Sequence, residues 1–181
     1  GKIYALRDVT GTVGNKSLIA ASIMSKKLAA GADGIVLDVK TGSGAFMPTV
    51  EEAIELANIM VEIGEDAGRD VVALVSDMNQ PLGYAVGNAL EVKEALDCLN
   101  GGGPEDLWLH SLEVAAYMVL LPGAAATLDE AKAMIISARE DGRGLAKFRE
   151  MVAAQGGDAT QVDQPQRLPR SPYAEPILAP R

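Results

Sequence analysis

Residues 34–46 read GIVLDVKTGSGAF, an apolar run that passes directly into a glycine-rich segment. A run of this length is typical of a buried β-strand followed by a loop. Thr49 and Glu52 have the spacing of a capping box and predict the start of an amphipathic helix. Residues 71–75 read VVALV, a second apolar run of strand type. Strand, helix and strand in this order predict a βαβ unit whose two strands are parallel.

The rest of the chain is predicted to be mostly helical. Residues 3–12 are short and β-prone, whereas residues 17–30 predict a helix followed by Gly31. Clusters of Gly and Pro separate four further predicted helices. These cover residues 88–99, 105–121, 127–139 and 144–155. Helices combined with a βαβ unit indicate the α/β class.

Composition excludes several classes of partner. The 181 residues carry 25 acidic and 16 basic side chains, a net charge of −9. We expect no nucleic-acid partner and no membrane partner, because such surfaces are usually basic. The most apolar stretch, residues 114–121, is shorter than the roughly 18 residues of a spanning helix. Cys98 is the single cysteine, which fits a reducing cytoplasm. Because the chain starts at Gly1, without Met, and its last residues are Pro-rich, we expect the central part of a longer protein.

A polar strip runs along the predicted helix of residues 17–30. Ser22 and Lys26 are four residues apart and share one face, while the other positions are nearly all apolar, so we expect the helix to be buried. A buried ammonium needs an acceptor, and the pattern allows either a structural carboxylate or a polar ligand. Arg7 precedes this helix, and a local ion pair with Asp8 is the ordinary alternative to a binding role.

Two predicted loops, residues 40–47 and 76–82, follow the strands. Ligands of open α/β sheets bind at the carboxyl ends of strands. The first loop lacks the third glycine of a dinucleotide fingerprint, so a structural turn is favoured there. His110 and Cys98 have no metal-ligand spacing, and His110 is interpreted as an ordinary helix residue.

Four motifs resemble the thymidine/pyrimidine-nucleoside phosphorylase family. They are YALRDVT at 4–10, SIMSKK at 22–27, VLDVKTGSGAFM at 36–47 and SDMNQ at 76–80. The resemblance covers nearly the whole chain and weakens after about residue 164. The stretch QPLGYAVGNALEVKE at 80–94 is similar to the broad-specificity bacterial members. Strict thymidine phosphorylase is the nearest alternative, and a non-catalytic, pyrimidine-binding or dimerising remnant is another.

The resemblance implies a fold, a reaction and an assembly. Its fold is a small helical domain beside a larger α/β domain with helices packed on a mixed sheet. Residues 1–30 would belong to the helical domain, 31–163 to the α/β domain and 164–181 to a linker. The reaction would be reversible phosphorolysis, in which inorganic phosphate attacks C1′ of a pyrimidine nucleoside and releases the base. The family forms homodimers.

The resemblance also implies the residues that bind the base. Arg7 and Lys26 match two cationic pyrimidine-binding positions, and Ser22 matches a hydroxyl contact to the base. The departing base develops negative charge, and fixed cations stabilise that charge more in the transition state than in the ground state. A bound base would supply the acceptor that Lys26 needs.

The broad-specificity members depend on potassium. By resemblance, the backbone carbonyls of Leu82 and Ala85 and the carboxylate of Glu94 would bind it, as hard cations take oxygen ligands. The ordinary alternative is that Glu94 is an exposed acid facing Lys93. The family's phosphate loops, its histidine and the remaining potassium ligands are expected upstream of this chain. We therefore expect the 181 residues alone to be inactive.

Overall fold

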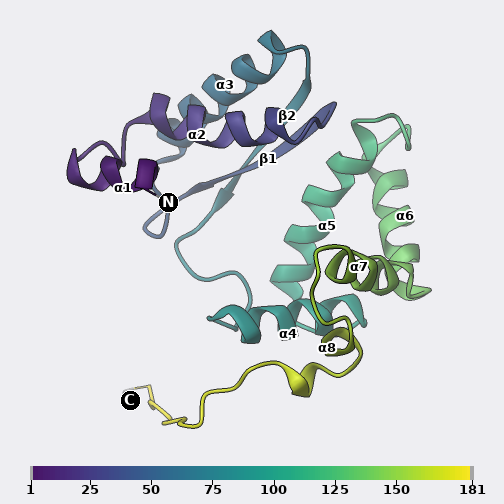
Figure 1. Cartoon of the computed structure of the whole chain (residues 1–181). Coiled ribbons are helices and arrows are strands. Elements are labelled where there is room, and N and C mark those ends of the chain that lie inside the picture. Colours follow the sequence, from purple (N-terminus) through teal and green to yellow (C-terminus); the bar gives the residue numbers. More distant parts are fainter. Residues whose placement is uncertain (1, 180–181) are drawn as a thin grey trace. The chain divides into compact units, whose positions relative to one another are not determined.

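The computed structural model describes residues 2–179, with the side chains of residues 5–179. The predicted boundaries at residues 1 and 181 lie outside this range. The elements in chain order are α1 (Lys2–Val9), α2 (Lys16–Ala29), β1 (Gly34–Thr41), α3 (Val50–Asp66), β2 (Asp70–Asp77), α4 (Asn88–Leu99), α5 (Glu105–Leu120), α6 (Leu128–Glu140), α7 (Arg143–Ala154), α8 (Thr160–Asp163) and the 3-10 helix η1 (Pro165–Arg167) (Figure 1). The predicted α/β class is confirmed. Within the described residues the sheet has two strands, which are parallel.

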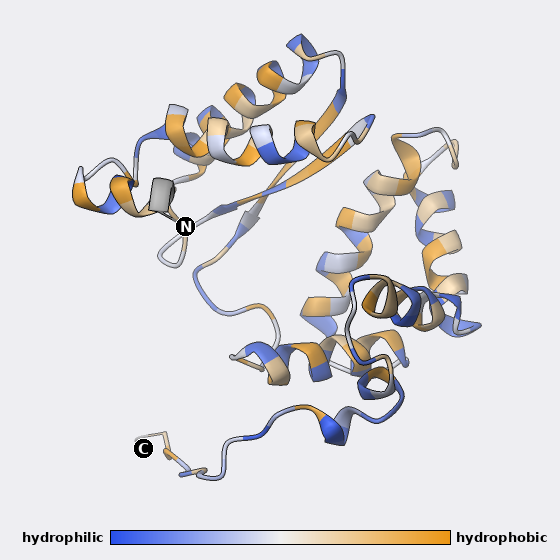
Figure 2. Cartoon of the chain, in the orientation of Figure 1, coloured by the Kyte–Doolittle hydropathy of each residue, from blue (hydrophilic) through white to orange (hydrophobic). Residues whose placement is uncertain are grey.

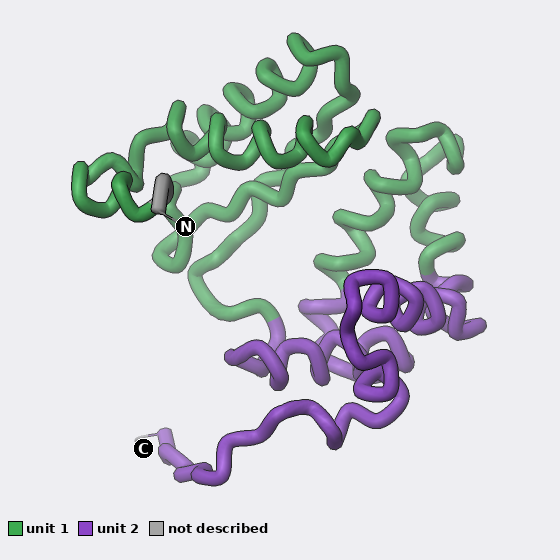
Figure 3. The backbone as a smooth tube through the Cα atoms, viewed as in Figure 1, with its two compact units in different colours: residues 1–82, 109–135 green, residues 83–108, 136–181 purple. Residues whose placement is uncertain are grey.

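The chain divides into two compact units (Figure 3). The first contains Gly1–Leu82 and Leu109–Ile135, and the second contains Gly83–Trp108 and Ile136–Arg181. The domain boundaries implied by the resemblance remain a prediction.

The βαβ unit forms as predicted. β1 and β2 pair in parallel, with Gly34 opposite Asp70 at one end and Thr41 opposite Asp77 at the other. Burial alternates along β1, as expected when successive side chains point to opposite faces. The hydroxyl of Thr49 accepts a hydrogen bond from the amide of Glu52 at 3.3 Å and caps α3.

One hydrophobic core joins α2, α3 and β1. The two helices lie side by side over the strands (Figure 1). Figure 2 shows hydrophobic residues recurring along both helices and concentrated along β2. Met24 of α2 and Met60 of α3 are among the most completely buried side chains, and burying one such side chain contributes roughly 1.5–3 kcal/mol. With few aromatic residues in the chain, methionines fill much of this core.

Two expectations about the N-terminal segment are wrong. Residues 2–9 form α1 and no strand, because Ala5, Leu6 and Arg7 favour a helix and the described residues offer no strand partner. The helix α2 is not buried all round: it buries Ile19, Ala20 and Met24 and exposes much of the rest. Its buried face packs on α3. Gly31 follows α2 with φ +78°, as predicted.

In the second unit Arg139 joins the end of α4 to the start of α5. Its guanidinium lies 3.9 Å from the ring centre of Trp108. It also donates hydrogen bonds to the carbonyl of Cys98 at 2.6 Å and to that of Gly102 at 3.2 Å. The carbonyl of Cys98 lies in the last turn of α4, where a cation is favourable, and Gly102 lies in the loop that follows. The predicted helices beyond residue 83 form within two residues of their expected ends. None of the described helices is long and apolar enough to cross a membrane.

Candidate functional site

The polar strip of α2 forms as predicted. Asn15 caps the helix by accepting the amide of Leu18 at 3.0 Å. Further along α2, the ammonium of Lys26 donates to the hydroxyl of Ser22, one turn before it, at 3.4 Å. Ser22 is half-buried and Lys26 is exposed, so the ammonium carries no large desolvation cost here. The structure therefore brings these two predicted residues together on an accessible face.

Arg7 lies near the end of α1 and points toward the turn before α2. Its Nη2 donates to the carbonyl of Val13 at 2.8 Å. Its Nε is buried and has no hydrogen-bond partner among the described residues. The ion pair with Asp8 that was the ordinary alternative does not form in the described part of the chain. A buried guanidinium nitrogen without an acceptor is costly, and an incoming acceptor would remove that cost.

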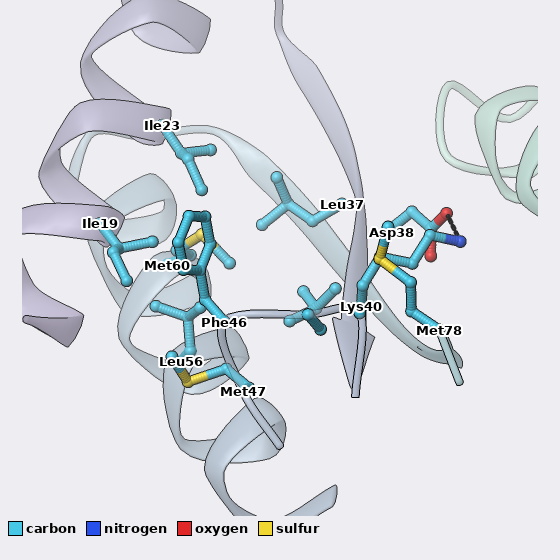
Figure 4. A pocket seen from close by; sticks show the side chains of 13 residues that line it. Ile19, Ile23, Leu37, Asp38, Lys40, Phe46, Met47, Leu56, Met60 and Met78 are labelled. Carbon is cyan, nitrogen blue, oxygen red and sulfur yellow. Dashed lines mark ion pairs between the residues drawn. The ribbon is translucent and has the colours of Figure 1, made fainter. Parts of the chain in front are cut away.

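A cavity of about 370 Å³ lies between α2, α3 and the loop after β1. Figure 4 shows Ile19 and Ile23 of α2 on the same side of β1 as Phe46 from that loop. Ile23 is the neighbour of Ser22, so α2 contributes both the polar strip and part of the apolar wall. Phe46 is 69% exposed although it lines the cavity. This pairing of apolar walls with a few polar groups is usual for small-molecule sites.

The opposite face of β1 carries a cluster of polar side chains that the sequence reasoning missed. The carboxylate of Asp38 accepts hydrogen bonds from Ser76 at 2.5 Å and from His110 at 2.7 Å. It also pairs with Lys40 at 2.8 Å. We call these four residues the Asp38 cluster. Figure 4 shows its Asp38–Lys40 ion pair beside Met78, on the other side of β1 from Ile19, Ile23 and Phe46.

Electrostatics explain how the Asp38 cluster is held. Burial raises the pKa of Asp38, but hydrogen bonds from Lys40, Ser76 and His110 outweigh it, so the pKa lies below its usual value. An ionised carboxylate only accepts, so the Nε2 of His110 donates in its hydrogen bond to Asp38. The Lys40 ammonium lies 3.1 Å from the same nitrogen but cannot then donate to it, and its acceptor is the carboxylate. The interpretation of His110 as an ordinary helix residue overlooked this contact. Charged residues at alternate positions of an apolar strand were the available signal, since they share one face and need partners.

Glu94 anchors the loop that precedes α4. Its Oε1 accepts the amides of Tyr84 at 3.0 Å and Ala85 at 3.1 Å. Among the described residues no hydrogen bond reaches its Oε2, which remains available to a cation. The alternative of an exposed acid is not observed, because Glu94 is half-buried and holds backbone amides. Leu82 belongs to the first unit and Glu94 to the second, so the structure gives no geometry for the complete predicted ligand set.

Known proteins resemble this chain along most of its length. The family model described as "Glycosyl transferase family, a/b domain" matches residues 1–145. The pyrimidine-nucleoside phosphorylase of Staphylococcus aureus strain bovine RF122 / ET3-1 is 59% identical over 172 residues, which are 95% of this chain and 40% of that protein. The protein of the same name from strain USA300 is 58% identical over the same length. The chain thus spans less than half of these relatives, and the resemblance predicted from the motifs is confirmed.

Proposed function

The chain belongs to the glycosyl transferase family, and from its 59% identity to a pyrimidine-nucleoside phosphorylase we propose that it is part of such an enzyme. The reaction is the reversible phosphorolysis of pyrimidine nucleosides or deoxynucleosides, with inorganic phosphate as co-substrate. The products are the free base and (deoxy)ribose 1-phosphate, so the enzyme would serve nucleoside salvage. One structural observation supports the proposal most strongly. The helix α2 bears both the polar strip of Ser22 and Lys26 and part of the apolar wall of the cavity.

A pyrimidine base matches that combination. One edge of its ring carries carbonyl oxygens and ring nitrogens, which suit Lys26, Ser22 and Arg7. Its opposite edge is apolar and suits the wall formed by Ile19 and Ile23. The Nε of Arg7 has no hydrogen-bond partner among the described residues, which supports the role of Arg7, because a bound carbonyl oxygen would satisfy it.

The chemistry of the leaving base explains the need for two cations. As the phosphate oxygen forms a bond to C1′, the bond from C1′ to the base nitrogen breaks. The electron pair stays with the base, which later takes up a proton. Arg7 and Lys26 would interact more strongly with this anionic base than with the neutral nucleoside. Loss of one such donor typically lowers turnover by about two to three orders of magnitude.

The test compares Arg7→Ala and Lys26→Ala with Lys27→Ala in the natural full-length protein. Lys27 is also an exposed lysine of α2, but it lies outside the polar strip and serves as the matched control. We expect kcat/KM for nucleoside to fall about 100- to 1000-fold in the first two variants and to change less than twofold in the control. A loss below fivefold in folded Arg7 and Lys26 variants would return both residues to a structural role.

Two measurements address the alternative functions. Relative rates on uridine and thymidine separate the broad-specificity enzyme, which we propose, from a strict thymidine phosphorylase. Release of free base by the full-length protein tests the alternative of a non-catalytic remnant, because a remnant would release none. We expect turnover from the full-length protein and none from the 181-residue chain, which covers only 40% of its relative.

A potassium ion is proposed for the loop before α4. A single half-buried carboxylate, completed by backbone carbonyls, would suit a monovalent cation. The Oε2 of Glu94 supports this assignment, because the hydrogen bonds from the amides of Tyr84 and Ala85 go to its Oε1. The carbonyls of Leu82 and Ala85 would be two further ligands, and the remaining ligands are expected outside this chain. The ion would supply a positive charge that holds this loop at the start of α4.

We also propose a cytoplasmic homodimer. The exposed apolar side chains of α1, with Leu6 60% and Val9 84% accessible, support an interface within residues 1–30. The lone, buried Cys98 suits a reducing compartment. Sedimentation of the full-length protein with Val9→Glu tests the interface: we expect a shift toward monomer.

A further inference from the structure

The loops that follow the two strands are joined at the carboxyl edge of the sheet. Thr41 ends β1 opposite Asp77, the end of β2. Just beyond them, the amide of Met78 donates to the carbonyl of Thr41 at 2.6 Å, and the amide of Gly44 donates to the carbonyl of Met78 at 2.9 Å. The glycine-rich loop therefore takes its position from the loop after β2 as well as from its own strand.

The side chain of Asn79 makes a third connection between the loops. Its Oδ1 accepts the amide of Ser43 at 3.0 Å. Its Nδ2 donates to the carboxylate of Asp77, which also accepts the amide of Asn79 at 3.3 Å. An ionised carboxylate can only accept hydrogen bonds, so the nitrogen of the amide must face Asp77 and its oxygen must face Ser43. Asp77 thereby fixes the orientation of Asn79.

The glycines of the loop show how closely the two segments approach. Gly42 has φ +119°, and a Cβ there would lie 2.8 Å from the Oδ1 of Asn79. A Cβ on Gly44 would lie 2.7 Å from the carbonyl oxygen of Met78. Such separations are shorter than real side chains tolerate. Glycine is thus required at both positions by close approach, and at Gly42 also by its φ.

The held loop forms one wall of the cavity. Gly44, Phe46 and Met47 line it together with Ile19 and Ile23 of α2 (Figure 4). Phe46 is exposed, so few packing contacts of its own would keep it at that wall. Within the loop, the amide of Gly42 donates to the carbonyl of Met47 at 3.0 Å, and Met47 is buried in the core. The hydrogen bonds to the backbone of residues 43 and 44 add the connection to the loop after β2. Asn79 makes the one to Ser43 and acts on the cavity through it, without lining the cavity.

We propose that Asn79 is a positioning residue, oriented by Asp77, that holds the loop of residues 42–47 against the nucleoside site and so raises the affinity for nucleoside. The proposal rests on the proposed function, since the cavity is taken as part of that site. The phosphate-binding segments are expected elsewhere in the protein. Loss of Asn79 therefore raises the KM for nucleoside and leaves the KM for phosphate unchanged.

The experiment uses four variants of the full-length protein. Asn79→Ala removes the acceptor of the Ser43 amide. Asn79→Asp keeps an acceptor but sets a second carboxylate against Asp77. The double variant Asp77→Asn, Asn79→Asp exchanges the two groups and restores one carboxylate facing one amide. Gln80→Ala is the control, because Gln80 also donates to Asp77, at 2.7 Å, and among the described residues makes no hydrogen bond to the glycine-rich loop.

Amide hydrogen exchange of residues 42–47 and steady-state kinetics are measured for each variant. Both single Asn79 variants should exchange about five- to tenfold faster, the equivalent of one lost hydrogen bond, and raise the KM for nucleoside by a similar factor. Values of kcat and the KM for phosphate should stay within twofold. The double variant should recover most of the loss, and the control should match wild type.

Unchanged amide hydrogen exchange of residues 42–47 in both single Asn79 variants would overturn the proposal that Asn79 holds the loop. A fall in kcat with both KM values unchanged would also overturn it, because that pattern indicates less active protein. If Asn79→Ala does not fold, Asn79→Asp is compared with the double variant. If the double variant does not recover slow amide exchange and the low KM for nucleoside, Asn79 does not hold the loop. If wild-type protein releases no base, the proposed function fails, while the exchange data still test the contact between Asn79 and the loop.

Discussion

Replacing Gly64 by alanine tests the packing that positions α2. Gly64 lies on α3, where the backbone comes close to β2 and to α2. A Cβ at this position would lie 2.2 Å from Cγ2 of Val71 and 3.1 Å from Cε of Met24. Valine is β-branched and stiff at χ1, so its methyl group cannot move away cheaply. The strand or the helix must shift instead.

Two opposing effects set the magnitude. Alanine favours a helix interior over glycine by about 1 kcal/mol. Overpacking of a core costs about 1–3 kcal/mol, and a separation of 2.2 Å places this site in the upper part of that range. We expect Gly64→Ala to lower the free energy of unfolding by about 1–2 kcal/mol. Tm should fall by less than about 2 °C for each kcal/mol, because the full-length relatives are more than twice as long as this chain and the shift shrinks with size.

Urea and thermal unfolding of the full-length protein measure this effect, with two comparison variants. Gly14→Ala is the control, because a Cβ at Gly14 meets open space and should change stability by less than about 0.5 kcal/mol. Adding Val71→Ala to Gly64→Ala removes the clash, so the double variant should be more stable than the sum of the single effects. A neutral or stabilising Gly64→Ala would show that α3 does not approach β2 so closely, and the positioning of α2 would need another explanation.

Three further outcomes are expected. Asp38→Asn should make the stability of the fold less sensitive to acid. Burial raises the pKa of Asp38, but the hydrogen bonds of its cluster outweigh burial and lower it. The ionised carboxylate therefore stabilises the fold above about pH 4, and this stabilisation is lost as pH falls through the folded-state pKa. Wild type should therefore lose more stability than the variant between pH 7 and pH 3 in urea titrations, and equal losses would argue against the cluster. Arg139→Lys should cost about 1–2 kcal/mol and alter the fluorescence of Trp108, because lysine cannot both stack on the ring and donate to two carbonyls; unchanged melting and emission would contradict this. Replacing potassium by tetramethylammonium should lower activity or Tm in wild type and not in Glu94→Gln; identical behaviour of wild type in both salts would leave Glu94 as a loop anchor only.

The sequence by itself determined the local elements and the family. The apolar runs of residues 34–41 and 71–75, the cap at Thr49 and the glycine after α2 each depend on neighbours a few positions away. Periodicity and capping chemistry act over that range, so they predicted the βαβ unit and most helix boundaries. They failed at α1. This segment is short and contains both β-prone residues and good helix formers, so its sequence is compatible with a strand or a helix. The family motifs also follow from residue identity alone.

Only the tertiary structure decided which distant residues meet. His110 contacts Asp38 across 72 positions, and Asn79 contacts Ser43 across 36. The structure also decided that α2 buries one face and exposes the strip with Ser22 and Lys26. Local propensity contains no information on these pairings. They depend on the path of the chain between the elements, and on which apolar faces can be covered once the strands have paired.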